Sequence, residues 1–310
     1  MTAVLKPPAR TALGGVTFLE LEITSRCQLT CASHCYAEAG PTKGHGSMTG
    51  ADWHALIDEA AAIGVTTVQF IGGEPTLHPD FAALVGHALE AGLRVQVYSN
   101  LYRVRAEHWA LFSLPQVSLA TSYYSDDPAE HDAITGRKGS HDSTRANIVE
   151  ALHSGIPLKV GIIHMRDGQR SQEALVEMKV LGVDQVSIDN VRAVGNAAKG
   201  PSLLPSTSEL CGRCADGKAA VLPDGTVAPC VLGRFLPAGD IRNGSLRQVL
   251  ESSTWEQVAA SIPRPYGRAG CTPDEDSCMP SPGKTITACK PNSDGSDCAP
   301  AETPACLPKY

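Results

Sequence analysis

Three cysteines lie close together near the start of the chain, in the stretch RCQLTCASHCYAEAG (26–40). Cys27, Cys31 and Cys35 have the spacing C-x3-C-x3-C and follow a run that is typical of a buried strand. Zinc in a closed structural site takes four ligands, usually from C-x2-C pairs. Three thiolates can instead bind three irons of a [4Fe–4S] cluster, which leaves the fourth iron open to a small molecule. A zinc site and buried free thiols are the alternatives.

A second candidate feature is IGGEP (71–75), at the end of the next expected strand. Gly72 and Gly73 would let the backbone approach a ligand closely. Glu74 adds a carboxylate suited to an ammonium group, and Pro75 completes the segment. Because the carboxyl ends of parallel strands meet on one rim, we expect this segment beside the cysteine loop. A tight turn without a ligand is the alternative.

The chain has eleven cysteines, which fall into three groups. Disulfides are rare in the reducing cytosol, so clustered cysteines there more often bind metal or do redox work. Cys211, Cys214 and Cys230 form the second group and predict a second site, for either an iron–sulfur cluster or structural zinc. The third group lies in a tail rich in Pro and Ser and comprises Cys271, Cys278, Cys289, Cys298 and Cys306. For these we weigh structural or cluster-tethering roles against a redox role.

Charge and hydropathy exclude several classes of protein. The formal net charge is −7 and there is no basic tract, which argues against nucleic acid or an anionic membrane as a partner. No apolar run approaches the roughly 18–20 residues that span a membrane. The N-terminal stretch MTAVLKPPARTALGG lacks the apolar core of a signal peptide. We therefore expect a cytoplasmic protein.

The elements that must position these residues alternate along the chain. Six apolar, β-prone segments are expected strands: 16–24, 65–73, 93–100, 116–125, 157–165 and 183–191. Five segments between them have helical periodicity or helix stop signals: 49–64, 80–92, 106–114, 142–155 and 171–182. Strands without a polar face, each followed by a helix, predict an α/β fold with a parallel sheet covered by helices. Right-handed crossovers favour a partial (β/α)6 barrel, and a flat doubly wound sheet is the alternative.

From about residue 197 this alternation stops. A hairpin is expected over 219–232, around the Asp224-Gly225 turn, and a helix over 245–262. The last segment is too polar to build a core, so it is either disordered or tied down by its cysteines. We expect four parts: an N-terminal segment (1–16), a barrel (17–196), a small extension (197–262) and a Cys- and Pro-rich tail (263–310).

The order of these motifs resembles the radical S-adenosylmethionine (SAM) superfamily. The resemblance rests on three cysteines after strand one, GGEP after strand two and the (β/α)6 pattern, and it covers roughly 17–250. It implies that the open iron is chelated by the amino and carboxylate groups of SAM, and that the GGEP segment contacts the amino group. The segments SYYSDDPAEHDAITGRKGS (122–140) and LCGRCADGKAAVLPDGTVAPC (210–230) are similar to those of the subgroup with SPASM or twitch extensions.

The chain departs from the family pattern at two positions of its barrel. The usual cluster spacing is C-x3-C-x2-C, and here one residue is inserted, although His34 still precedes Cys35. Tyr124 stands where the family has Asp, so Ser122 is the better candidate for a ribose contact.

The tail cysteines do not fit the C-x2-C-x5-C-x3-C continuation of complete SPASM domains. The resemblance therefore favours a twitch-like unit with one auxiliary [4Fe–4S] cluster on the second cysteine group. Its fourth ligand is a tail cysteine, with Cys278 the candidate, or the site is open.

Further residues at strand ends are candidates for contact with SAM or substrate. Ser99 and Asn100 end strand three, where contact with SAM competes with ordinary strand-end capping. Asp189 and Arg192 end strand six, and Arg192 could pair with the SAM carboxylate or form only a salt bridge. Tyr123, Tyr124 and His164 are the candidate catalytic residues, which either face the substrate or pack in the barrel.

The resemblance also implies an activity. One electron from an external reductant would split SAM into methionine and a 5′-deoxyadenosyl radical, which abstracts hydrogen from the substrate. Enzymes with such extensions most often mature ribosomally made peptides through crosslinks, thioether bonds or epimerisation. Only some sixteen residues precede strand one, so leader recognition would need a separate protein or the barrel rim. The alternatives are a small-molecule substrate such as a sugar or nucleotide, and a metal-binding scaffold without catalysis. A cobalamin-dependent methylase fits less well, because no preceding α/β domain is present to hold cobalamin.

Overall fold

The computed structural model of the chain describes residues 13–31, 33–199 and 204–264. Most of the N-terminal segment and almost all of the tail, with Cys278 and the other tail cysteines, therefore lie outside the described residues. In the described part, no helix is long and apolar enough to cross a membrane.

Within the described residues, nine strands form one sheet. They are β1 (Phe18–Thr24), β2 (Thr67–Gly72), β3 (Arg94–Tyr98), β4 (Val117–Tyr123), β5 (Leu158–His164), β6 (Gln185–Asn190), β7 (Lys218–Val221), β8 (Thr226–Ala228) and β9 (Gly239–Asp240). Their order is β6-β5-β4-β3-β2-β1-β7-β8-β9, with parallel pairing from β6 through β7. A doubly wound sheet reverses its strand order, whereas β1 to β6 follow one another without reversal. The prediction of a partial (β/α)6 barrel is confirmed.

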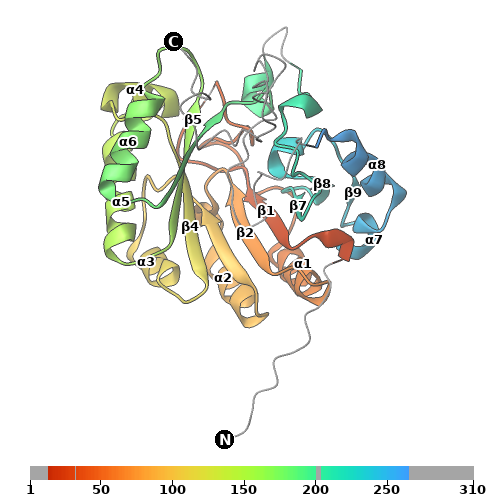
Figure 1. The fold of residues 1–310 in the computed structure, drawn as a ribbon. Coiled ribbons are helices and arrows are strands. Elements are labelled where there is room, and N and C mark those ends of the chain that lie inside the picture. The colour runs from red at the N-terminus through yellow and green to blue at the C-terminus, as the bar shows by residue number, and fades with distance from the viewer. Residues whose placement is uncertain (1–12, 32, 200–203, 265–310) are drawn as a thin grey trace, which may run out of the picture.

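The helices of the barrel lie along its outer side (Figure 1). They are α1 (Gly50–Ala62), α2 (Phe81–Glu90), α3 (Ala106–Phe112), α4 (Pro128–Thr135), α5 (Ser140–His153) and α6 (Ser171–Leu181). Short 3-10 turns are η1 (Leu13–Gly15), η2 (Pro75–Leu77), η3 (Gly195–Lys199), η4 (Thr207–Glu209) and η5 (Val231–Gly233). Helix α4 was not expected. Its start signals are nevertheless in the sequence, because the Asp127 side chain accepts a hydrogen bond from Glu130 N and Pro128 occupies the first turn.

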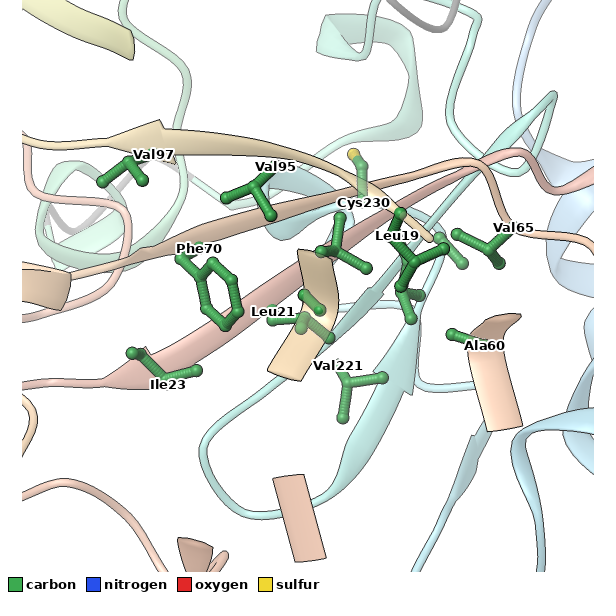
Figure 2. Packing of buried hydrophobic residues seen from close by; sticks show 14 of the residues in the cluster. Leu19, Leu21, Ile23, Ala60, Val65, Phe70, Val95, Val97, Val221 and Cys230 are labelled. Atoms are coloured by element: carbon green, nitrogen blue, oxygen red, sulfur yellow. The ribbon is translucent and has the colours of Figure 1, made fainter. Parts of the chain in front are cut away.

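The main core lies between the sheet and these helices. All seven residues of β1 are buried, so both faces of this strand are covered. Leu19, Leu21 and Ile23 pack in the main hydrophobic cluster with Phe70 of β2 and Val95 of β3 (Figure 2). Full burial of one such side chain stabilises the fold by about 1.5–3 kcal/mol. The alternate residues of β1, two of them glutamates, therefore point to the barrel interior.

The extension joins the barrel sheet rather than packing beside it. Strand β7 pairs in parallel with β1, and β8 pairs antiparallel with β7, which confirms the predicted hairpin. Expected as one helix, residues 245–262 form α7 (Leu246–Leu250) and α8 (Ser253–Ser261), because Ser252 starts a second helix by capping Trp255 N. Glu59 of α1 accepts hydrogen bonds from the first amides of α7. The barrel and the extension thus share one continuous sheet.

Candidate active site

One cavity of about 230 Å³ opens at the carboxyl ends of the barrel strands. Each of the six barrel strands, β1 to β6, contributes a side chain to its wall: Glu20, Gln69, Tyr98, Ser122, Ile163 and Asp189. Side chains from six successive strands can surround one cavity only if the sheet is curved, as in a barrel. A cavity therefore lies at the rim where the sequence predicts the chemistry.

The cysteine loop forms one side of the cavity, where Cys27, Cys31 and Cys35 all line the wall. The loop is closed by Cys27 N, which donates to Gly40 O (3.1 Å), and by Cys35 N, which donates to Cys31 O (3.2 Å). The sulfurs of Cys27 and Cys35 accept hydrogen bonds from the backbone amides of Leu29 and Ala39, each at 3.4 Å. Such hydrogen bonds tune iron–sulfur clusters when the sulfurs carry negative charge.

Burial sets the protonation of these thiols in the metal-free protein. It raises the pKa of Cys27 to about 12 and raises the pKa values of Cys31 and Cys35 as well. For Cys31 the negative charges of the other two thiolates add to this effect. Metal binding must then release protons, as expected of a cysteine site. Three thiols that line one cavity, one buried and two half-buried, fit the donor set of a [4Fe–4S] cluster with one open iron.

The GGEP segment packs directly against the cysteine loop. Gly73 N donates to Thr24 O and Glu74 N to Arg26 O, both at 2.8 Å. A Cβ atom on Gly73 would lie 2.4 Å from Arg26 O, which is closer than real Cβ atoms approach. Glycine is therefore required here for the contact between the two segments. Gly72 and Gly73 both line the cavity, which brings the backbone of this segment to the expected rim.

Glu74 differs from expectation, because its carboxylate lies outside the cavity wall. It is 1% exposed, and it accepts hydrogen bonds from Thr76 Oγ1 (2.7 Å), Ser99 Oγ (3.0 Å) and Asn100 N (2.9 Å). Burial raises its pKa, against the opposing effect of these donors. The carboxylate thus ties the end of β2 to the end of β3. Ser99 and Pro75 are also buried and do not line the cavity. The side chains of Glu74, Pro75 and Ser99 are therefore not placed to contact SAM in this cavity.

Asn100 and Ser122 do line the cavity, as expected. Asn100 Nδ2 lies 3.5 Å from Cys27 Sγ, so this amide joins the end of β3 to the first cysteine. Ser122 Oγ forms a hydrogen bond of 3.1 Å with the hydroxyl of Tyr98, on the neighbouring strand. Both are therefore placed to contact a ligand beside the cysteines.

The three candidate catalytic residues separate into two groups. Tyr124 lines the cavity, and its hydroxyl forms a 3.1 Å hydrogen bond with His34 Nε2 in the cysteine loop. Tyr123 points the other way, and its buried hydroxyl contacts His141 (2.7 Å) and Glu177 (2.9 Å). Successive side chains of a strand point to opposite faces, so neighbouring tyrosines cannot both face the cavity.

His164 is likewise on the helix side of its strand. Its Nδ1 lies 2.9 Å from Ser171 Oγ at the start of α6, while the preceding residue, Ile163, lines the cavity. Tyr123 and His164 thus take the packing alternative, and Tyr124 is the candidate that faces the cavity.

Asp189 and Arg192 both line the cavity and form a bidentate ion pair, with two N–O distances of 2.9 Å. Arg192 Nε also donates to Glu209 O at 2.8 Å. Burial raises the pKa of Asp189, while the Arg192 guanidinium opposes the shift. The salt-bridge alternative is thus realised, and contact between Arg192 and a SAM carboxylate stays a prediction.

The sequence reasoning missed a second ion pair in the cavity wall. Glu20 of β1 lies 3.2 Å from Lys218 of β7, with both side chains almost fully buried. The other Glu20 oxygen accepts a 2.7 Å hydrogen bond from Val231 N, directly after Cys230. A signal was available, because glutamate alternates with apolar residues in the otherwise apolar run VTFLELEIT.

The second cysteine group forms a compact buried cluster at the base of the extension. Cys211, Cys214 and Cys230 are all buried, and the Cys214 thiol contacts the other two, which raises its pKa together with burial. The sulfurs of Cys211 and Cys230 accept hydrogen bonds from the amides of Arg213 (3.4 Å) and Gly233 (3.2 Å). Among the described residues, no three His, Cys, Asp or Glu side chains form a ready site for a single metal ion. The three thiols fit part of the ligand set of an iron–sulfur cluster, which is usually held by four cysteine thiolates.

Two family models match the chain. The radical SAM superfamily matches residues 21–188, and SPASM, an iron–sulfur cluster-binding domain, matches residues 211–278. The second match contains all three buried cysteines of the extension and ends at Cys278, which lies outside the described residues. These domains bind SAM and [4Fe–4S] clusters, so the cofactors expected from the sequence are confirmed.

Curated relatives include PqqA peptide cyclases. The one from Streptomyces rochei is 28% identical over 204 residues, which cover 64% of this chain and 55% of the relative. The one from Ruegeria pomeroyi is 31% identical over 196 residues, which cover 61% and 51%. The chain thus spans about half the length of the curated relatives it matches.

Solved structures share the fold at low sequence identity. SuiB of Streptococcus suis bound to the precursor peptide SuiA has a TM-score of 0.65 at 13% identity, over 81% of this chain and 68% of SuiB. The enzyme anSMEcpe with bound AdoMet and a peptide has a TM-score of 0.57 at 14% identity, over 78% and 82%. The radical SAM family match covers more than half of the chain, which shows that the chain belongs to the radical SAM superfamily.

Proposed function

We propose that this protein is a radical SAM enzyme that abstracts hydrogen from a residue of a peptide substrate. One observation carries the proposal: residues next to both cysteine groups line the same cavity. Cys27, Cys31 and Cys35 form one side, while Val231 and the adjacent Leu232, directly after Cys230, form another. A substrate in this cavity would lie between the two cysteine groups. The names of the PqqA peptide cyclases and the peptide-bound SuiB and anSMEcpe structures support a peptide as that substrate.

When bound and reduced, the cluster and SAM supply a 5′-deoxyadenosyl radical, which carries the difficult chemistry. The protein must hold the substrate in a productive orientation and exclude water. Three hydroxyl groups face the cavity beside the cysteines. They belong to Tyr98 of β3, Ser122 of β4 and Tyr124, which directly follows β4. Their hydrogen bonds to one another or to His34 hold these side chains in place before a substrate binds.

The charges of the cavity wall favour a neutral substrate group over a phosphorylated one. Its two basic side chains already pair with carboxylates, Lys218 with Glu20 and Arg192 with Asp189. A phosphate would have to compete with both pairs for these cations. This distribution favours a peptide over a nucleotide or sugar phosphate.

We assign Cys211, Cys214 and Cys230 to one auxiliary [4Fe–4S] cluster, with Cys278 as the candidate fourth ligand. The auxiliary site can accept the electron that remains when a crosslink or thioether bond forms, whereas epimerisation needs a hydrogen donor instead. We further propose an external one-electron reductant in the cytoplasm. Leader recognition would require a separate leader-binding protein or the barrel rim.

The test uses anaerobically reconstituted protein and peptides encoded beside its gene. Two clusters predict about eight irons per chain. The variant Cys27→Ala/Cys31→Ala/Cys35→Ala should keep about half of the iron and form no 5′-deoxyadenosine. The matched variant Cys211→Ala/Cys214→Ala/Cys230→Ala should also lose half of the iron but retain the first cluster.

Mass spectrometry of the peptide then identifies the reaction. Loss of two hydrogens indicates a crosslink or thioether bond, while uptake of one solvent deuterium without other mass change indicates epimerisation. Iron and 5′-deoxyadenosine with no change in any peptide, but turnover of a sugar or nucleotide, would refute the peptide assignment. Absence of 5′-deoxyadenosine under all conditions would refute the enzymatic proposal and favour a metal-binding scaffold.

A further inference from the structure

Arg234 connects the two cysteine groups through its side chain. It follows η5, the single turn that Cys230 caps through its sulfur. Arg234 Nη1 donates to both carboxylate oxygens of Glu22, at 3.0 and 3.2 Å, and to Tyr36 O at 3.3 Å. Tyr36 directly follows Cys35. One guanidinium thus contacts the loop of the first cysteine group from a turn that begins at the second.

Tyr36 extends this connection to the GGEP segment. Its backbone carbonyl accepts the hydrogen bond from Arg234, while its hydroxyl donates to Gly72 O at 3.4 Å. Its ring also lines the cavity. A displacement of Arg234 would therefore reach a cluster ligand, through the peptide bond to Cys35, and the glycine turn at the same rim.

The buried charge of Glu22 holds the Arg234 side chain in this position. Glu22 is fully buried in β1, and Arg234 is the cation beside it, itself 23% exposed. Separation of a buried ion pair leaves an uncompensated charge, so the folded protein must keep Arg234 close to Glu22. The side chain is thereby held at one point, from which it also reaches Tyr36.

We propose that Arg234 is a positioning residue through which occupancy of the auxiliary site sets the geometry of the SAM-cluster loop. A cluster bound at Cys230 would order the turn that presents Arg234, and Arg234 would in turn hold Tyr36 and Cys35. By linkage, each site then affects the affinity of the other. This inference rests on the proposed auxiliary cluster at Cys211, Cys214 and Cys230.

The first test needs no cofactor. Hydrogen exchange is measured on iron-free protein in the double variant Glu22→Gln/Arg234→Gln, which removes both charges and leaves no unpaired buried ion. Loss of a charged hydrogen bond should speed exchange of segment 26–40 by about tenfold or more, while β3 exchanges as in wild type. Arg247→Gln, which breaks an exposed pair with Glu251 in the same extension, is the matched control and should change nothing.

The conservative variant Arg234→Lys keeps the charge beside Glu22, so it tests the link even if the double variant does not fold. A lysine ammonium cannot take the position of Nη1 without a change in side-chain geometry, so it should give a smaller but measurable acceleration. Wild-type exchange of segment 26–40 in a folded variant would overturn the proposal.

The second test measures the coupling in reconstituted protein. SAM is titrated while the electron paramagnetic resonance signal of the reduced first cluster is recorded. Cys230→Ala should weaken SAM binding about tenfold in the wild-type background and have no further effect in Glu22→Gln/Arg234→Gln. Equal effects of Cys230→Ala in both backgrounds would overturn the coupling.

Iron content, measured together with the second test, separates this inference from the auxiliary-cluster assignment. If wild type holds only about four irons, and the variant of the first three cysteines holds none, the assignment fails and the coupling proposal fails with it. Iron at both sites with additive effects instead refutes only the role of Arg234.

Discussion

Replacement of Gly195 by alanine is the sharpest test of how the barrel holds the cysteine loop. Gly195 follows β6 with φ at +61°, and a Cβ atom there would lie 2.3 Å from Tyr36 O and 2.5 Å from Cys35 O. An ordinary contact begins near 3.4 Å, so the loop that carries Cys35 must move by about 1 Å. The next residue, Asn196, donates to Cys35 O at 2.9 Å and to Cys31 O at 3.3 Å, so both contacts would also be disturbed.

The chain provides a matched control in Gly155, whose φ is +66° and which has nothing within 4 Å of an added Cβ atom. Gly155→Ala should therefore cost only the left-handed backbone, about 1–2 kcal/mol. Gly195→Ala adds the steric conflict, about 1–3 kcal/mol more.

Urea unfolding of the iron-free proteins measures this difference, and iron content after reconstitution measures its effect on the first cluster. We expect Gly155→Ala to retain both clusters, and Gly195→Ala to lose the iron bound by Cys27, Cys31 and Cys35. Equal losses of stability in the two variants, with full iron content in both, would refute the conclusion that close backbone contact holds the loop.

Four further predictions concern single side chains. Tyr124→Phe removes a hydroxyl that faces the cavity and should lower the yield of modified peptide about tenfold with little change in unfolding free energy. Tyr123→Phe should instead lower the unfolding free energy by about 1–3 kcal/mol, because buried His141 loses a hydrogen-bond partner. Formation of 5′-deoxyadenosine should persist in this variant. Glu74→Gln puts an amide donor where the Thr76 and Ser99 hydroxyls already donate. We expect the unfolding free energy in urea to fall by about 1–3 kcal/mol and the first cluster to hold less iron. Wild-type values of both would contradict this role. Burial lowers the pKa of His131 from 6.5 to about 4, so the unfolded chain takes up a proton that the folded protein does not. The contribution of neutral His131 to the unfolding free energy is fully present above pH 6.5 and should fall by about 3 kcal/mol as the pH drops toward 4. The variant His131→Gln should make this decrease shallower, as measured by urea unfolding at each pH.

Much of the fold could be predicted because its signals are local. The strands of the barrel are rich in apolar residues and most helices between them end next to a glycine, so the order of elements is readable. The first cysteine group and GGEP are short segments whose place after a strand puts them on one rim. The match of the chain to the radical SAM superfamily over 21–188 agrees with that reading.

Which neighbouring side chain faces the cavity could not be predicted in this way. Every residue of β4 and β5 is buried or half-buried, so the burial expected from the sequence does not distinguish the barrel interior from the helix side. From the sequence, Tyr123, Tyr124 and His164 are equal candidates to face the substrate, whereas the cavity wall contains Tyr124 and, beside His164, Ile163. Curvature of the whole sheet decides the matter, because it determines which face of each strand is enclosed.

By itself, then, the sequence determined the barrel, the two cysteine groups and the rim on which the first of them lies. Only the tertiary structure decided that β7 would extend the sheet beside β1, and that Glu20 would meet Lys218 across the cavity wall. It also decided that Arg234 would reach Tyr36, 198 residues away along the chain. Such contacts have no local signature, because they depend on how distant segments close around a buried charge rather than on any spacing within one segment.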